Sequence, residues 1–170
     1  MEEEKSRFIN DEILTLTILG GLGRGSVYPT GIQENDKAGF KIFLRKQLYQ
    51  YGKKYRNNVS EKDHIANIKQ ITQEITNRYS KILKDNKFRI GTAQKLLNLY
   101  LKYLWVLDEI PEPPHCPFDR KIIEKLGLDI NWTKLDSIDD YRKMVERARN
   151  IAGDNNLSIA GWELKAWSGK

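Results

Sequence analysis

The chain has 170 residues, of which 39% are hydrophobic, and its 29 Lys and Arg against 23 Asp and Glu give a net charge of +6. This length and composition predict one globular domain, residues 1–170, with a hydrophobic core. They exclude an intrachain disulfide, because Cys116 is the only cysteine, and no apolar run is long enough to span a bilayer. With no signal-peptide pattern after the acidic start Met1–Lys5, we expect a cytoplasmic protein without a membrane partner.

The charge is distributed unevenly along the chain. Between Lys37 and Lys102 there are sixteen Lys and Arg but four Asp and Glu, a net charge of +12, so the remaining residues together carry −6. A basic middle between acidic ends indicates a polyanionic partner. We therefore expect nucleic acid to be the first candidate partner, with DNA ahead of RNA.

The first 35 residues predict an irregular segment or a short helix. The β-branched residues within 13–19 allow a strand, whereas Asn10 and Asp11 ahead of them suit a helix cap; because no partner strand is evident, we favour a helix. The glycines of 20–26 resemble a phosphate loop, but the Lys that a Walker loop needs before Ser26 is missing. We interpret 20–26 as a flexible turn, with a phosphate-contacting loop as the alternative.

Three helices are predicted in the basic middle. Residues 35–56 predict the first, because apolar side chains recur there every three or four residues. A capping box at Ser60–Asp63 opens the second, which ends at Asp85–Asn86. The third begins near Thr92 and is apolar on more than one face, so we expect it to be the central buried helix.

The last third of the chain predicts shorter helices after a proline-rich connection. Four prolines between 111 and 117 impose an extended backbone. We expect a short helix from Pro117 to just before Gly127, a helix opened by the capping box Ser137–Asp140, and a last helix capped by Ser158. The whole pattern predicts an all-α, single-domain bundle of about six helices. The tryptophans are expected to be core residues: Trp105, Trp132, Trp162 and Trp167.

His115, Cys116 and Asp119 form the one group of potential metal ligands that lie close together in the sequence. A zinc site takes about four ligands, commonly in paired spacing, and His64 is far away. A Cys116 nucleophile activated by His115 is another alternative, but neighbours on a proline-constrained turn rarely point at one another. We therefore expect no metal and no cofactor, and we expect Asp119 near a helix start, where a carboxylate favours the N-terminal dipole.

The basic middle supplies the predicted nucleic-acid contacts. From 41 to 56 there are six cations and no acidic residue, interleaved with tyrosines, a pattern suited to phosphates. An ordinary solvated lysine-rich surface is the alternative interpretation. The predicted contact residues are Lys41, Arg45, Lys46, Lys53, Lys54, Arg56, Lys87, Arg89, Gly91, Thr92 and Lys95.

Two segments resemble the helix-hairpin-helix DNA glycosylase superfamily. Phe88–Lys95 is similar to the family's hairpin, a hydrophobic-glycine turn that leads into a long helix, and the resemblance implies that the turn at 90–92 binds a DNA phosphate through backbone N–H groups. Pro117–Gly127 looks like the stretch that follows the hairpin. It implies that Asp119 is the catalytic aspartate, which supports a flipped-out base and the charge developing on its sugar.

The chain departs from this family's pattern in three ways. The hairpin lacks the second glycine, the connection to Asp119 is longer and rich in proline, and Gly91 or Thr92 occupies the neighbourhood where lyase-active members carry a lysine. For an enzyme, the resemblance therefore implies a base-excising hydrolase without a Schiff-base lysine. Residues 94–105 followed by 113–119 are also similar to a bacterial family that has no established activity, and this second resemblance implies none.

The sequence thus predicts a nucleic-acid-binding helical protein that uses its basic middle third, with glycosylase-like base excision as its candidate activity. The alternative is a protein-interaction module, such as a phage or defence component, that docks its basic face on an acidic protein surface. A small-molecule enzyme built on the glycine loop at 20–25 ranks third.

Overall fold

The computed structural model describes residues 1–23 and 27–169, and every element within them is helical. The α-helices are α1 (Glu2–Leu22), α2 (Glu34–Lys54), α3 (Glu61–Tyr79), α4 (Ile90–Val106), α5 (Arg120–Lys125), α6 (Ile138–Asp154) and α7 (Ile159–Ser168). Short 3-10 helices lie between them: η1 (Ser80–Ile82), η2 (Lys84–Asn86) and η3 (Trp132–Lys134). The predicted all-α bundle is confirmed. No helix of the described residues has the length and apolar character needed to cross a bilayer.

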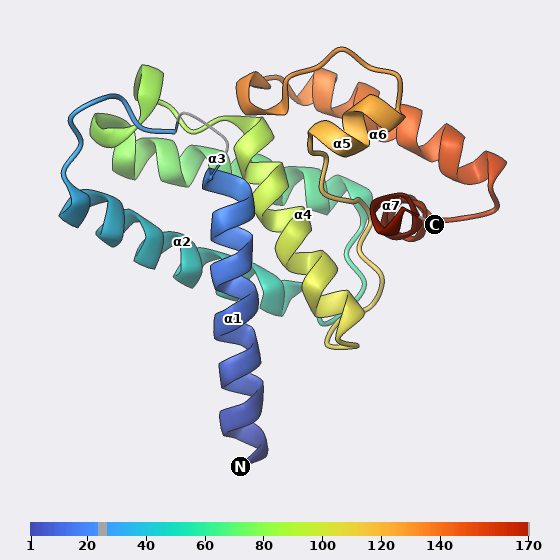
Figure 1. Ribbon diagram of the computed structural model, residues 1–170, viewed down its shortest axis with the longest axis horizontal. Helices are drawn as coiled ribbons and strands as arrows, with labels where there is room; N and C mark the ends of the chain where they lie inside the picture. Colours follow the sequence, from blue (N-terminus) through green and yellow to red (C-terminus); the bar gives the residue numbers. More distant parts are fainter. Residues whose placement is uncertain (24–26, 170) are drawn as a thin grey trace.

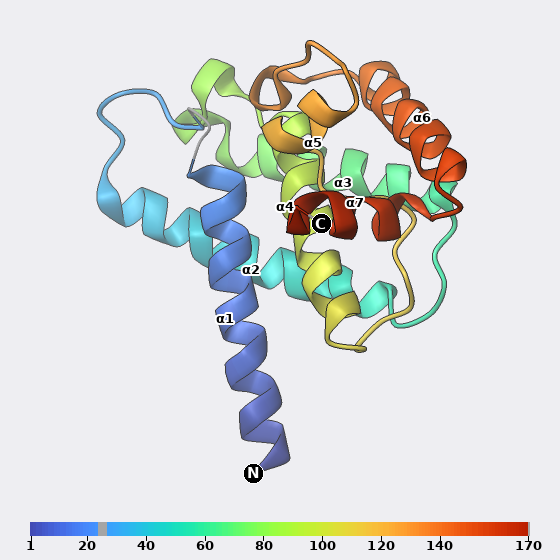
Figure 2. The ribbon, with the colours of Figure 1, turned by 45° about the vertical axis from the view of Figure 1, so that its right-hand side comes forward.

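Helix α4 lies at the centre of the molecule (Figures 1 and 2). Helices α1, α2 and α3 pack against it, and α6 contacts it from the other side, where α5 and α7 complete a smaller C-terminal layer. Because apolar residues occupy more than one face of α4, it is buried along most of its length. The prediction that this helix is central is confirmed.

The three serine caps predicted from the sequence are confirmed. The side chains of Ser60, Ser137 and Ser158 each accept a hydrogen bond from the backbone N–H three residues later, and they start α3, α6 and α7. Each cap satisfies one of the N–H groups that the first turn of a helix leaves without an intrahelical partner.

The N-terminal segment differs from the prediction. Helix α1 begins at Glu2 instead of near Asn10, and it continues through Gly20 and Gly21. Three glutamates in the first turn favour this start, because they complement the helix dipole. The two glycines let α4 approach closely, since a Cβ built on Gly20 would lie 2.7 Å from Leu99 Cδ2. The rest of the predicted turn, 24–26, lies outside the described residues.

Two further expectations are corrected. Helix α5 begins at Arg120 and is capped by Asp119, so Pro117 precedes the helix instead of opening it. Trp167 is 48% exposed, whereas Trp162 is buried. Trp167 follows Trp162 by five positions, which turns it roughly 140° around the helix from Trp162.

Gly91 fixes how the start of α4 packs. Its N–H donates to the carbonyl of Leu135 over 2.9 Å. A Cβ at this position would overlap the carbonyl oxygen of Trp132, so only glycine allows η3 to lie directly on the first turn of α4.

We therefore expect Gly91→Ala to lower the free energy of unfolding by about 1–3 kcal/mol or more, because the clash is with backbone that cannot rotate away. The matched control is Gly39→Ala, an exposed glycine of α2 whose Cβ would meet nothing within 4 Å. The control should raise stability by up to about 1 kcal/mol through helix propensity. Urea unfolding followed by circular dichroism measures both, and equal stability of Gly91→Ala and the native chain would contradict this packing.

Candidate nucleic-acid interface

Helix α2 carries the densest group of cations on the side that its apolar residues leave free. Phe40, Leu44 and Leu48 are buried in the core. Since side chains at other helical positions point away from this stripe, the cations of 41–56 face outward or sideways. Arg45 is partly buried, and the other five are exposed: Lys41, Lys46, Lys53, Lys54 and Arg56.

Arg45 is tied to α1. Its guanidinium donates to Thr15 Oγ1 over 2.8 Å and pairs with Asp11 over 3.2 Å. The five exposed cations, four on α2 and Arg56 just after its end, have no ion pair within the part of the chain that the structure describes. The ammonium of Lys53 instead lies 4.4 Å from the centre of the Tyr49 ring, and that of Lys54 lies 4.1 Å from the centre of the Tyr51 ring.

The predicted contact residues that precede and open α4 are placed differently. Lys87 pairs with Asp136, and Arg89 pairs with Asp85 and Asp136. Lys95 is buried against Asp119, with 2.8 Å between Nζ and Oδ2. Three of these pairs join residues far apart in the sequence, so residue spacing gave no sign of them.

Gly91 and Thr92, the predicted phosphate anchor, are buried. The N–H of Gly91 already donates to Leu135, and η3 covers this turn. In this arrangement neither residue faces solvent, and the exposed cations of the predicted set are those of α2 together with Lys87.

Asp119, the predicted catalytic residue, has both carboxylate oxygens engaged inside the protein. Oδ1 accepts from the backbone N–H of Ile122 over 3.0 Å, which caps α5, and Oδ2 accepts from Lys95. The side chain is 17% exposed. The geometry gives Asp119 the role of a helix cap that also compensates a buried ammonium.

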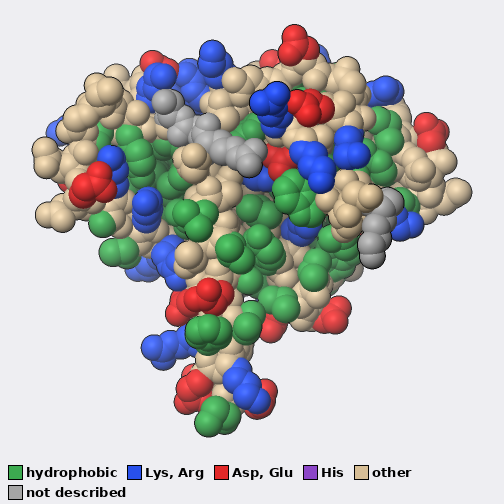
Figure 3. All heavy atoms as spheres, in the orientation of Figure 1, with side chains coloured by type: hydrophobic (Ala, Val, Ile, Leu, Met, Phe, Trp, Pro, Cys, Tyr) green, Lys and Arg blue, Asp and Glu red, His purple; other side chains and the backbone are tan. Residues whose placement is uncertain are grey.

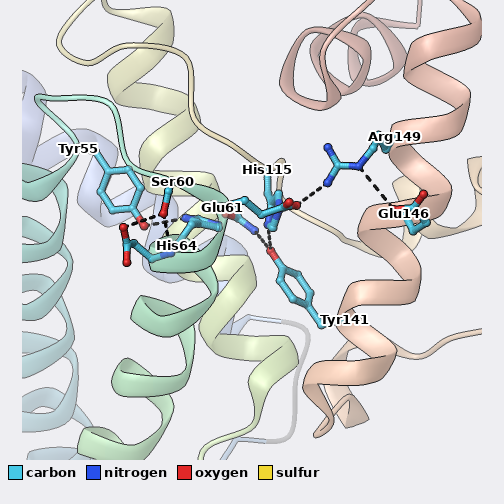
Figure 4. Close-up of polar contacts among 10 residues, drawn as sticks. Tyr55, Ser60, Glu61, His64, His115, Tyr141, Glu146 and Arg149 are labelled. Carbon is cyan, nitrogen blue, oxygen red and sulfur yellow. Dashed lines mark hydrogen bonds and ion pairs between the residues drawn. The ribbon is translucent and has the colours of Figure 1, made fainter.

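A polar network that sequence reasoning missed joins α3, the proline-rich connection and α6 (Figure 4). His115 Nδ1 lies 2.7 Å from Tyr141 OH, and its Nε2 lies 2.7 Å from Glu61. Glu61 in turn pairs with Arg149 on α6. The proline-rich connection is thus fixed between two helices by a single imidazole.

His64 extends this network inward. Its Nδ1 lies 2.7 Å from Tyr55 OH, and its ring meets that of His115 edge to face with the centres 4.7 Å apart. Burial lowers the pKa of His64 to about 3, and it also lowers the pKa of His115. The signal was present in the sequence, because His64 occupies a core position of α3, four residues before Ile68.

The three potential metal ligands do not converge. The His115 imidazole faces Glu61 and Tyr141, while Asp119 faces Lys95. Cys116 is fully buried, and burial raises the pKa of its thiol, which keeps it protonated. Among the described residues, no group of three or more His, Cys, Asp or Glu side chains is arranged to hold a metal ion.

No protein-family model, curated protein or solved structure matches this chain.

The buried histidines predict a pH dependence of stability. In the unfolded chain they bind protons below about pH 6.5, whereas in the folded protein their pKa values are lowered, so the unfolded state binds more protons as the pH falls. The free energy of unfolding should be highest above about pH 6.5. Below that pH it should decline by up to about 1.4 kcal/mol per pH unit for each histidine. Urea unfolding between about pH 8 and about pH 5 measures the slope. The chain has two histidines, so His64→Gln should reduce the slope, and a flat profile would exclude buried neutral imidazoles.

Asp119→Ala should destabilise the fold by roughly 3–5 kcal/mol, because it removes the α5 cap and leaves the buried Lys95 ammonium unpaired. Asp119→Asn retains a capping oxygen and should cost less. Ser60→Ala, which removes a cap from α3 without unpairing a charge, is the control and should cost about 1 kcal/mol. Chemical denaturation compares the three variants. If Asp119→Ala lowered the free energy of unfolding no more than Ser60→Ala, the Lys95–Asp119 ion pair would not contribute to stability.

Proposed function

We propose that this protein binds nucleic acid, and DNA in the first place, through the exposed cations of α2 and Arg56 just after it. The observation that carries the proposal is that the cations predicted to contact nucleic acid fall into two groups. Lys87, Arg89 and Lys95 have acidic partners in the fold. The second group has none among the described residues: Lys41, Lys46, Lys53, Lys54 and Arg56.

The second group is the one that a polyanion would stabilise. Cations at neighbouring positions of one helix repel one another, so their arrangement costs free energy while they remain uncompensated. A phosphate backbone removes this repulsion and releases its own condensed counterions. Cations already paired inside the protein gain less, because their carboxylate partners would have to be displaced or would repel the phosphates.

Tyr49 adds a feature that suits nucleic acid in particular. It is 40% exposed between Lys46 and Lys53 on α2, with the Lys53 ammonium over its ring. An exposed tyrosine offers a face on which a base can stack, while the lysines beside it contact the flanking phosphates. Asp119 has no part in the proposal, because its oxygens are used by the fold.

The double substitution Lys46→Ala with Lys53→Ala should weaken binding to all sequences alike and reduce the slope of log affinity against log salt by about 2, roughly one per lost phosphate contact. Arg120→Ala with Lys143→Ala removes the same charge from exposed residues that pair with Glu124 and Asp140, and it should change little. Fluorescence anisotropy with duplex DNA, single-stranded DNA and RNA at two salt concentrations measures both variants.

Heparin is the competitor that separates recognition of nucleic acid from simple charge attraction. Binding of one nucleic-acid form that survives heparin supports the proposal. Binding that heparin removes completely, or equal losses in the two double variants, would favour docking on an acidic protein surface. Absence of binding at low salt would overturn the proposal.

A further inference from the structure

A groove of about 810 Å³ lies between α1, α2 and the end of α4. Its floor consists of buried side chains, Ile13 and Leu14 of α1 with Tyr100 and Leu104 of α4. The hydroxyl of Tyr100 donates to Asn10 Oδ1 over 2.6 Å, which holds the floor against α1. A recess of this size with an apolar floor is typical of a site for a small molecule or for one group of a larger ligand.

The two walls of the groove differ in charge. Every charged residue on the α2 wall is a cation: Arg45, Lys46, Lys53 and, just after the helix, Arg56. The other wall is the N-terminal part of α1, which projects beyond the body of the protein (Figures 1 and 2) and has acidic, basic and apolar side chains next to one another (Figure 3). Its charged residues at the groove are Glu2, Glu3, Lys5, Arg7 and Asp11, and beyond α4 the groove ends at Glu109. A polyanion is therefore attracted to the α2 wall and not to the side with four acidic residues against two cations.

Tyr49 joins the cationic wall to the groove. Its ring is exposed between Lys46 and Lys53, and the same residue lines the groove. A base that stacks on an aromatic ring keeps its phosphates a short distance away along the strand, where cations beside the ring can contact them. A base on Tyr49 thus places its phosphates on the α2 wall while its own ring lies at the groove.

Asn10 gives the groove a hydrogen-bond donor for a neutral ligand. Its Oδ1 accepts from Tyr100, whereas its amide nitrogen makes no hydrogen bond within the residues that the structure describes. An amide N–H can donate to a ring nitrogen or a carbonyl oxygen of a base. The groove thus combines an apolar floor with a polar group that a nucleobase can use.

We infer that the nucleic acid bound by α2 is a single strand, one unpaired base of which lies in the groove against Tyr49. The inference rests on the proposed function and narrows its ligand to this class. A base is neutral, so the carboxylates of the groove do not repel it, and the phosphates of the strand stay on the α2 wall. The mixed charge of the groove is therefore compatible with a base, although it is not compatible with a phosphate backbone.

A duplex suits this distribution of charge less well, for two reasons. It has two backbones, so a duplex that contacts Lys46 and Lys53 with one strand brings the phosphates of the other toward the glutamates of α1. Like charges placed in this way reject the wrong ligand. The faces of its bases are also covered by stacking, and a base reaches Tyr49 only after the duplex has been unpaired at a cost in free energy.

The test compares one labelled oligodeoxynucleotide of mixed sequence, alone and annealed to its complement, by fluorescence anisotropy at the same salt concentration. The native chain should bind the single strand about fivefold or more tightly than the duplex, because only the single strand gains a stacked base. An RNA strand of the same sequence shows whether the sugar matters. The double substitution Glu2→Gln with Glu3→Gln removes charge from the α1 wall, so it should raise the affinity for the duplex more than that for the single strand.

Tyr49→Ala tests the base contact itself. It should lower the affinity for the single strand by about 5- to 150-fold without changing the slope of log affinity against log salt, because stacking involves no counterions. The affinity for the duplex should not change. Trp167→Ala is the matched control, since Trp167 is an exposed aromatic residue that does not line the groove, and it should change neither affinity.

A single strand that carries iodouracil gives the position of the base. Irradiation of its complex with the native chain should link it to the peptide that contains Tyr49. Equal affinities for the two forms, together with equal effects of Tyr49→Ala and Trp167→Ala, would overturn the inference and leave the proposed function intact, as would crosslinks confined to peptides away from the groove. A native chain that binds no nucleic acid would overturn both.

Discussion

The polar side chains of the central helix constrain the rest of the fold. Gln94 is completely buried in α4, and leaving its amide without partners there would cost about 1–3 kcal/mol for each unsatisfied group. Gln94 meets the backbone of Phe118 with both of its amide atoms, donating over 2.8 Å and accepting over 3.2 Å. These two hydrogen bonds fix the place where the proline-rich connection returns to α4, with Phe118 beside Gln94. The positions of His115, Cys116 and Asp119 follow from that return, which turns their side chains to different partners instead of toward one another.

The buried positions of α4 also determine which cations of the protein are paired with carboxylates. Burying Lys95 and Lys102 in α4 requires carboxylates beside them, and Asp119 and Glu163 supply these. Acidic residues of the C-terminal third thus pair with the cations of the central helix. Asp136 pairs with Lys87 and Arg89, which precede that helix. Among the described residues, the cations of the basic middle that remain without an ion pair lie on α2 and just after it, on α3, and on the two 3-10 helices that follow α3. The charge asymmetry seen in the sequence is real, and the fold removes from it the cations that pair with Asp119, Asp136 and Glu163.

Local signals predicted the fold well, and long-range pairing explains what they missed. Apolar periodicity and the serine caps of α3, α6 and α7 depend on residues within one or two turns, so the sequence contains them in full. The role of Gly91 depends on Trp132, and the ion pair of Lys95 depends on a residue 24 positions away. Neither partner is marked by spacing. The sequence interpretation of Gly20 and Gly21 as a turn was wrong for the same cause. What requires glycine there is the close approach of α4, which is a distant segment of the chain.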